Sequence, residues 1–481
     1  MRSDSSAKLQ FFDYFCVCVL MFEVKRKVMF HKRIESVKVY AGGVAIGGGS
    51  PVRLQSMTNT DTDDVAATVG QCLRLAEAGS ELVRITVPTL KQVPKLREIQ
   101  SELRRQGIGT PVVADVHFSP EVAEACAHFA EKVRINPGNF VDKRVFNYHD
   151  YSDTEYASAL ERMAERAWPL LEICKAHNTL LRIGVNHGSI CDRVVSRYGN
   201  TPLAMAVSAV EWIDICENYG FGNFLLSMKS SNPKTMIDST LLLVDMMKKR
   251  GTVYPLHVGV TEAGGGMEGR AKSAVGIGAL LLCGVGDTIR VSLTEKPEKE
   301  IPFAQTLVGV SEKLHSDAYF VDDARTLHLT YETADKYELL AAAGAVCGYE
   351  HFSNGIKNLV IENPLLDNSE NQIVTDCILQ ACRIKTDRAE FISCPSCGRT
   401  RYDIESVLEA VKKRFSKYAG VKIGVMGCVV NGPGEMADAD FGVVGTTNGK
   451  LIVYKGKTKM SSPLPIDEAL QKMEMLIIEN Q

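Results

Sequence analysis

From residue 52 onward, short apolar runs rich in β-branched residues alternate with longer segments whose apolar positions recur every three to four residues. The first pattern is typical of buried strands and the second of amphipathic helices. The strands are predicted at Val52–Thr58, Glu81–Val87, Pro111–His117, Lys132–Gly138, Leu180–Asn186, Asn223–Lys229, Tyr254–Val260 and Thr288–Leu293. The helices between them include Asp63–Ala78, Thr154–His177, Thr201–Tyr219 and Lys234–Arg250. Eight such units in about 260 residues predict a (β/α)8 TIM barrel spanning 33–304, with a doubly wound open sheet as the alternative.

The pattern changes after the barrel. Residues 305–389 carry mixed strand and helix patterns, such as Thr326–Tyr331 and Asp335–Gly344, and lack the Gly, Ser and Pro content of a flexible linker. We therefore expect an inserted spacer domain there. Residues 390–481 predict a small α/β domain. Its elements are the helices Ile404–Tyr418 and Pro465–Glu479 and the strands Val421–Met426, Phe441–Gly445 and Leu451–Tyr454.

The first 32 residues do not share these patterns. Leu9–Phe22 is apolar but is interrupted by Asp13, is too short to span a bilayer, and lacks a small-residue cleavage site. Met21 and Met29 are alternative starts, and patterned sequence begins only near Arg33. We interpret residues 1–32 as a non-native or disordered extension. The glycine cluster at 42–49 is not followed by a helix and predicts a hairpin before the barrel.

Composition narrows the class of protein. The 481 residues carry a formal net charge of −3 and are 45% hydrophobic, as expected of an ordinary globular protein. A chain without a basic excess is not a general binder of nucleic acid or of membrane surfaces. Most of the 14 cysteines lie within apolar runs, which is typical of buried thiols in a reducing compartment. We therefore expect a cytoplasmic protein.

Charged and polar side chains gather where the predicted strands end. They are Arg84, Asp115, His117, Arg134, Asn136, Arg182, Asn186, Lys229, His257, Arg290 and Ser292. Because the carboxyl ends of barrel strands form the active-site mouth, these side chains should converge. Five cations at one opening predict an anion site, and arginine suits phosphate particularly well. The glycine-rich loop that follows Glu262 adds backbone amides. For His117, His187 and His257 we expect neutral hydrogen-bonding roles.

The third domain contains the one cysteine pair with the spacing of metal ligands, Cys394 and Cys397. Cys428 lies in a glycine-rich segment that lets a third thiolate approach closely. Zinc would usually require a second Cys-x-x-Cys or a His pair, and none follows. Three thiolates without a fourth favour an iron–sulfur cluster with one unusual position. The alternative is a reduced pair beside an unrelated buried cysteine.

Taken together, these residues resemble the 4-hydroxy-3-methylbut-2-enyl diphosphate synthase family of the non-mevalonate isoprenoid pathway. The matching strings are Val52–Thr60, Lys132–Asn139, Arg182–Gly188, Gly259–Gly264, Ile392–Arg399 and Gly427–Glu435. The resemblance implies a [4Fe–4S] cluster held by Cys394, Cys397, Cys428 and Glu435. It implies two-electron reductive ring opening of 2-C-methyl-D-erythritol 2,4-cyclodiphosphate, with ferredoxin or flavodoxin as the electron donor.

The same resemblance assigns roles to the barrel residues. Glu262 becomes the candidate proton donor. The substrate-binding residues become Arg84, Asp115, Arg134, Asn136, Arg182, Asn186, Lys229, Thr261, Arg290 and Ser292. Shorter family members lack the segment 305–389, so a homodimer, and a site built from one chain or two, both stay open. The alternative functions are a non-redox barrel transferase resembling dihydropteroate synthase with a structural metal module, and a zinc-bearing binding module.

Overall fold

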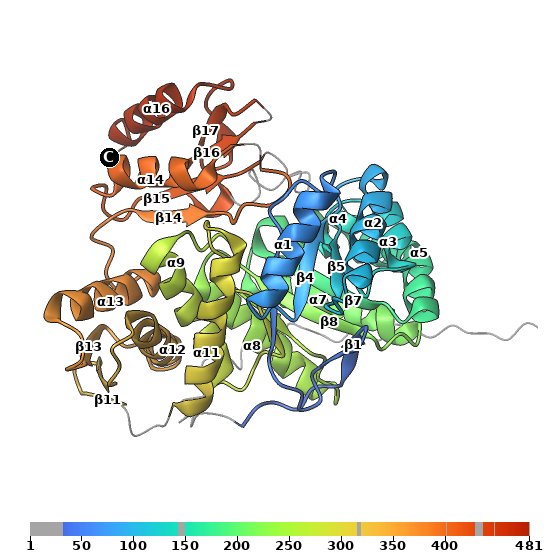
Figure 1. The fold of residues 1–481 in the computed structure, drawn as a ribbon, viewed down its shortest axis with the longest axis horizontal. Helices are drawn as coiled ribbons and strands as arrows, with labels where there is room; N and C mark the ends of the chain where they lie inside the picture. Colours follow the sequence, from blue (N-terminus) through green and yellow to red (C-terminus); the bar gives the residue numbers. More distant parts are fainter. Residues whose placement is uncertain are drawn as a thin grey trace, which may run out of the picture.

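The computed structural model describes residues 32–142, 150–314, 319–400, 402–428, 436–446 and 448–480. Residues 1–31 of the predicted extension and Glu435 lie outside these ranges. Within them, an eight-stranded parallel sheet runs in the order β8-β7-β6-β5-β4-β3-β10-β9 (Figure 1). A further bridge between Leu226 and Leu256 brings the two ends of the sheet together, so the barrel is nearly closed. The TIM-barrel prediction is confirmed, and the open-sheet alternative is wrong.

The strands and helices of the barrel alternate as predicted. The strands are β3 (Arg53–Met57), β4 (Leu82–Thr86), β5 (Val112–Asp115), β6 (Lys132–Ile135), β7 (Leu180–Asn186), β8 (Phe224–Lys229), β9 (His257–Val258) and β10 (Thr288–Ile289). The main helices are α1 (Val65–Glu77), α2 (Val93–Arg105), α3 (Pro120–Ala127), α5 (Asp153–His177), α7 (Pro202–Asn218), α8 (Pro233–Lys249), α9 (Gly266–Ser273) and α11 (Glu300–Lys313). The predicted strand Lys132–Gly138 is too long. Asn136 accepts a hydrogen bond from the Gly138 amide and begins the short helix α4 (Pro137–Phe140).

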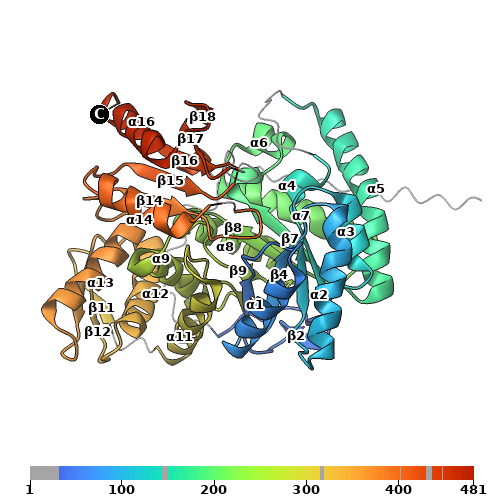
Figure 2. The ribbon, with the colours of Figure 1, turned by 45° about the horizontal axis from the view of Figure 1, so that its top comes forward.

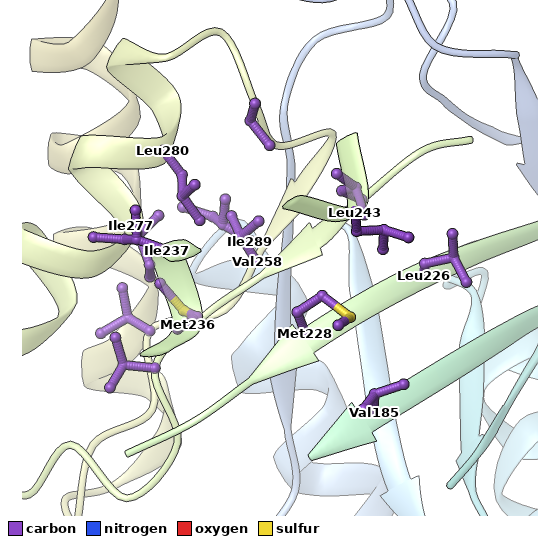
Figure 3. Close-up of a cluster of buried hydrophobic side chains, with 14 of the residues drawn as sticks. Val185, Leu226, Met228, Met236, Ile237, Leu243, Val258, Ile277, Leu280 and Ile289 are labelled. Atoms are coloured by element: carbon purple, nitrogen blue, oxygen red, sulfur yellow. The ribbon is translucent and has the colours of Figure 1, made fainter. Parts of the chain in front are cut away.

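The two faces of the barrel strands differ in chemistry. Figure 3 shows Val258 of β9 and Ile289 of β10 beside Ile277 and Ile237 of the surrounding helices, and the same core includes Leu226 and Met228 of β8. The residues that alternate with the apolar ones along the barrel strands, such as Arg182 of β7 and Lys229 of β8, line the interior. The apolar outer face therefore holds the helical ring in place, while the inner face is left for polar chemistry.

The amino end of the barrel is filled by a hairpin. Strands β1 (Val39–Ala41) and β2 (Val44–Ile46) pair antiparallel, which confirms the hairpin predicted from the glycine cluster. Its apolar side chains share a core with the first inward residue of four barrel strands: Leu82, Val113, Leu180 and Leu225. The opposite, carboxyl end of the barrel is the end that faces the C-terminal domain.

The inserted segment is folded onto the barrel. Strands β11 (Tyr319–Val321), β12 (Thr326–Thr330) and β13 (Asn358–Glu362) form a sheet, and α12 (Lys336–Asn354) and α13 (Asn368–Ala381) lie against it. The α12 residues Leu339, Leu340 and Val346 belong to the same continuous core as the barrel helices. The predicted boundary at 304/305 falls within α11, which is the barrel's eighth helix.

The C-terminal domain is a five-stranded sheet with its own core. Its strands are β14 (Glu390–Ser393), β15 (Lys422–Met426), β16 (Phe441–Gly445), β17 (Leu451–Lys455) and β18 (Thr458–Lys459), with helices α14 (Ile404–Phe415) and α16 (Ile466–Ile478). In Figure 2 this domain, coloured orange to red, lies over the region where β7 and β8 end. No helix in the described part of the chain is long and apolar enough to cross a bilayer.

Candidate active site

A single cavity lies between the barrel mouth and the C-terminal domain of the same chain. Its barrel wall is formed by Met57, Arg84, Asp115, His117, Arg134, Arg182, Asn186, Lys229, Thr261, Glu262, Arg290 and Ser292. Its other wall is formed by Cys394, Pro395, Cys397, Arg399, Thr400, Met426, Gly427 and Cys428. The structure thus brings together most of the predicted site residues, and one chain supplies both walls.

The cavity is strongly cationic. Among its described lining residues, six carry a guanidinium or ammonium group and two carry a carboxylate. Burial, and then the charge of Arg84, lower the pKa of Arg182 well below its usual value, and burial followed by the charge of Arg182 does the same to the pKa of Lys229. Arg182 is 1% exposed, and its Nε and Nη1 have no hydrogen-bond partner among the described residues. Buried donors of this kind need a hydrogen-bond acceptor, and an anion would supply one together with compensating charge.

Asp115 is the carboxylate around which the cations of the mouth gather. Its Oδ1 lies 3.3 Å from Arg134 Nη1 and 4.0 Å from Arg84 Nε, and its Oδ2 lies 3.4 Å from Arg399 Nη2. Burial acts to raise the pKa of Asp115, but the three guanidinium groups outweigh it and hold that pKa well below its usual range. The carboxylate therefore stays charged at neutral pH.

Two glycines, Gly184 within β7 and Gly259 directly after β9, make room for cations that cross the barrel. A Cβ at Gly184 would lie 2.6 Å from Arg134 Nε, and a Cβ at Gly259 would lie 2.6 Å from Lys229 Nζ. Neither glycine was predicted to belong to the site. A glycine inside a buried strand is a signal of close approach, but the sequence does not show what approaches.

Other positioning residues were also missed. Glu300 is 1% exposed and accepts hydrogen bonds from Arg290 Nε at 3.0 Å and Nη2 at 2.9 Å. The Met57 sulfur accepts from Arg84 at 3.0 and 2.9 Å. One layer below the mouth, Lys132 donates to Gln55 Oε1 at 3.2 Å. These contacts join residues that are far apart along the chain, so no local sequence motif predicts them.

Asn136 is a predicted substrate-binding residue that does not line the cavity. Its amide nitrogen lies 2.8 Å from Ser189 Oγ and 3.3 Å from His117 Nε2, so it supports the histidine from behind. His117 Nδ1 lies 3.1 Å from Arg134 Nη1. Burial, followed by the charges of Arg134 and Arg399, lowers the pKa of His117 well below its usual value. This direction agrees with the neutral role expected for the ring.

Glu262 occupies an unusual backbone conformation at the edge of the cavity. Its φ is 49°, in the left-handed region that non-glycine residues rarely adopt, and its side chain is buried. Its carbonyl oxygen accepts a hydrogen bond from the Ser393 amide at 3.1 Å, and the next residue, Ala263, pairs with Ser393 as an extra rung beside β14. The docked C-terminal domain thus fixes the residue in place, and backbone strain of this kind is concentrated at functional sites.

The three cysteines line one wall of the cavity. Cys394 follows the end of β14 and Cys428 follows the end of β15. Because these neighbouring strands run parallel, both cysteines lie at the same edge of the sheet. The Gly427 amide donates to Cys394 Sγ at 3.1 Å. Burial raises the pKa of the Cys394 thiol well above its usual value, and this amide acts in the opposite direction. In the described part of the chain, no three His, Cys, Asp or Glu side chains converge closely enough to enclose one metal ion.

These features define a TIM barrel whose cationic mouth faces a cysteine-bearing α/β domain. Models of the GcpE TIM-barrel domain and of the GcpE protein C-terminal domain match residues 36–305 and 390–479. The chain is 36% identical to the 4-hydroxy-3-methylbut-2-en-1-yl diphosphate synthase (flavodoxin) of Phocaeicola vulgatus, over 94% of this chain and 98% of the relative. It is 39% identical to the ferredoxin-dependent synthase of Parasynechococcus marenigrum, over 94% and 95% of the two chains. The chain belongs to the 4-hydroxy-3-methylbut-2-en-1-yl diphosphate synthase family.

Solved structures that are similar to this chain include more distant proteins. Dihydropteroate synthase of Xanthomonas albilineans has 19% identity and a TM-score of 0.38, covering 58% of this chain and 99% of that one. Among the curated relatives, the alignment with the Phocaeicola vulgatus protein spans 604 positions and that with the Parasynechococcus marenigrum protein spans 452. The first of these alignments is longer than the 481 residues of this chain, so the Phocaeicola vulgatus protein is the longer of the two.

Proposed function

We propose that this chain catalyses the two-electron reductive dehydroxylation and ring opening of 2-C-methyl-D-erythritol 2,4-cyclodiphosphate to (E)-4-hydroxy-3-methylbut-2-enyl diphosphate. The observation that carries the proposal is the single cavity in which a cationic barrel mouth faces three cysteines. A cyclic diphosphate is small and densely anionic, and converging guanidinium groups suit it. The relatives are named as synthases of 4-hydroxy-3-methylbut-2-en-1-yl diphosphate, which supports the same product.

The residues present fit a [4Fe–4S] cluster. Three cysteines share one wall of the cavity, and a backbone amide donates a hydrogen bond to one of the sulfurs. Cys394, Cys397 and Cys428 would hold the cluster, with Glu435 as the fourth ligand. When bound, the group supplies single electrons and a Lewis-acidic iron, neither of which a side chain provides.

The protein's own side chains bind, orient and protonate. The charge of the diphosphate would be neutralised by Arg182 of β7, Lys229 of β8 and Arg290, which directly follows β10. Glu300 holds the Arg290 guanidinium by two hydrogen bonds, so that side chain is already oriented before substrate enters. Glu262 would carry the proton needed when the hydroxyl leaves as water. The C-terminal domain forms the wall that faces the barrel mouth.

The electron donor is the other part of the proposal. The relatives are named for flavodoxin and for ferredoxin, so we infer that one of these supplies the electrons. The folded insert, 305–389, would serve as the spacer that carries the C-terminal domain to the mouth of its own barrel. A homodimer is compatible with this arrangement but is not needed to complete the cavity.

Anaerobic purification followed by a visible spectrum and iron and sulfide assays tests the proposal. A brown protein with iron and acid-labile sulfide, which turns over the cyclodiphosphate with a reduced donor, is the expected result. A colourless protein containing zinc would instead identify a binding module. A colourless, metal-free protein would favour a transferase resembling dihydropteroate synthase.

Removing one cation of the mouth should mainly weaken substrate binding. Arg182→Ala and Lys229→Ala each delete a charge-assisted contact worth about 1.5–3 kcal/mol, which corresponds to a rise in KM of about 10–100-fold. No described side chain depends on Arg182 Nε or Nη1, so its removal should leave the fold intact. Steady-state kinetics measure the effect. Arg166→Ala, which removes an arginine paired with Glu121 on the outer helices, is the control. An unchanged KM in both mouth variants would refute the assignment.

A further inference from the structure

A layer of buried polar side chains lies inside the barrel, one level below the mouth. We call it the polar layer, and its members, each at most 1% exposed, are Gln55, Lys132, Ser227, His257 and Thr288. Side chains two positions apart on a strand face the same way. Four members precede by two positions a residue that lines the cavity, and His257 likewise precedes Gly259, over which Lys229 passes. Below the layer, the apolar core shared with the hairpin fills the amino end of the barrel.

The hydrogen bonding of the polar layer is incomplete. Lys132 Nζ donates to Gln55 Oε1 at 3.2 Å, and His257 Nδ1 lies 3.3 Å from Thr288 Oγ1. Among the described residues, Gln55 Nε2, Ser227 Oγ and His257 Nε2 have no hydrogen-bond partner. Half-satisfied polar groups in a barrel interior are less favourable than apolar side chains of the same size. The polarity of this layer is therefore not explained by the stability of the barrel.

Lys132 is the ammonium group of the polar layer, and no member of the layer is acidic. In the described part of the chain it forms no ion pair, and its hydrogen bond goes to a neutral amide. Burial, followed by the charges of Arg182 and Arg84, lowers the pKa of Lys132 well below its usual value. Burial and then Arg182 act in the same direction on the pKa of His257. The barrel thus favours the uncharged amine as long as the mouth carries no added negative charge.

The charged and titratable groups around Lys132 come from the other strands of the barrel. They are Arg84 of β4, Asp115 of β5, Arg182 of β7, Lys229 of β8, His257 of β9 and Arg290, which follows β10. On its own strand Arg134 lies two residues further on, and Glu262 lies at the edge of the mouth. Asp115 is already paired with Arg134, and Arg290 is paired with Glu300. A dianion bound at the mouth would therefore change the charge balance that Lys132 experiences.

We propose that Lys132 takes up a proton from solvent when the cyclic diphosphate binds above it, so that the polar layer becomes charged together with the occupied mouth. The inference rests on the proposed function and extends it to a residue that does not line the cavity. Each phosphorus of a cyclic diphosphate carries a single, strongly acidic hydroxyl, so the ligand arrives ionised and brings no proton. The amine of Lys132 becomes an ammonium group, which offsets part of the added negative charge. Because binding consumes a proton, Kd should rise with pH.

The alternative is that Lys132 only fills the barrel and donates a hydrogen bond to Gln55. Two variants separate these roles. Lys132→Gln keeps a donor for Gln55 but cannot titrate, whereas Lys132→Met removes both properties. Lys95→Met is the control, because Lys95 is an exposed lysine of α2 that pairs with Glu98. A purely structural role predicts that Lys132→Gln takes up as many protons as the unmodified protein.

The test is calorimetric titration of the anaerobically purified holoenzyme with the cyclodiphosphate, in buffers of different ionisation enthalpy. The dependence of the heat on the buffer gives the number of protons taken up, and repeating the titration between about pH 7 and 9 gives the slope of Kd. We expect the unmodified protein and Lys95→Met to take up about one to two protons, with Kd rising about tenfold per pH unit for each. Both Lys132 variants should lose about half a proton or more and show a shallower slope. Iron content and thermal unfolding check that each variant is loaded and folded.

Two outcomes would overturn the inference. One is the absence of proton uptake in the unmodified protein, which requires no variant to fold. The other is an unchanged proton number in either Lys132 variant, which would assign the uptake to another group such as Lys229. Both outcomes leave the proposed function standing, because the substrate is bound in each. Failure of the unmodified, cluster-loaded protein to bind the cyclodiphosphate would instead refute the proposed function itself.

Discussion

Glu262→Gln should lower turnover by about 10²–10⁴ while cluster content and substrate affinity stay near those of the unmodified protein. Glutamine keeps the size of the side chain and removes its acid. Glu262 is suited to the role because it is buried at the cavity edge and is held at a φ of 49° by the docked strand β14. A residue without a functional role at the cavity edge would be expected to adopt an unstrained backbone conformation.

The measurement is kcat with a chemically reduced donor, together with iron content and the substrate Kd. Glu268→Gln is the matched control, because Glu268 lies on the same side of the barrel, pairs with Lys412 and does not line the cavity. That control should retain most of its turnover. If Glu262→Gln turned over at a near-normal rate, the proton would have to come from another group.

The barrel was predicted correctly because the sequence shows two clear periodicities, one typical of buried strands and one typical of amphipathic helices. Alternation along β7 and β8 places apolar residues such as Leu226 outward and Arg182 and Lys229 inward. Since parallel strands all end at one edge, knowing where each strand ends was enough to gather the cations. The helices α5, α7 and α8 likewise begin and end within a residue of their predicted bounds.

What sequence reasoning missed depends on contacts across the barrel or between domains. Gly184 and Gly259 are in the site because Arg134 and Lys229 pass over them, and Glu300 because it reaches Arg290 from an outer helix. These relationships exist only once the sheet has closed. Asn136 is a polar residue at a strand end that caps the short helix α4 and does not line the cavity, and its role in substrate binding stays a prediction.

The C-terminal domain shows a similar limit. Strand β14 was not predicted, because Glu390–Ser393 is short and its apolar character is diluted by the polar residues at its two ends. Yet this strand decides the geometry of the site, because it runs parallel to β15 and so presents Cys394 and Cys428 at the same edge. The Cys-x-x-Cys spacing identified the ligands, and the unpredicted strand explains why the third cysteine lies on the same wall.

Glu435→Ala should still assemble some cluster but lose nearly all turnover. Glu435 lies outside the described residues, so the argument comes from the sequence: it follows Cys428 by seven residues, beyond a Gly-Pro-Gly turn that can fold the chain back. Three cysteines leave one iron of a four-iron cluster without a thiolate, and a carboxylate there is a harder ligand that exchanges more readily. Glu435→Cys should therefore bind the cluster firmly yet respond little to substrate.

Electron paramagnetic resonance of the reduced protein, with and without the cyclodiphosphate, separates these cases from a purely structural role for Glu435. A change of spectrum on adding substrate is expected in the unmodified protein and should be weak in Glu435→Cys. Glu405→Ala, which removes an exposed glutamate at the start of α14 in the same domain, is the control and should match the unmodified protein. If Glu435→Ala kept full activity and an unaltered spectrum, the fourth ligand of the cluster would have to be water or another side chain. The three cysteines of the cavity wall would keep their assignment in that case, because their grouping rests on β14 and β15 and not on the segment that follows.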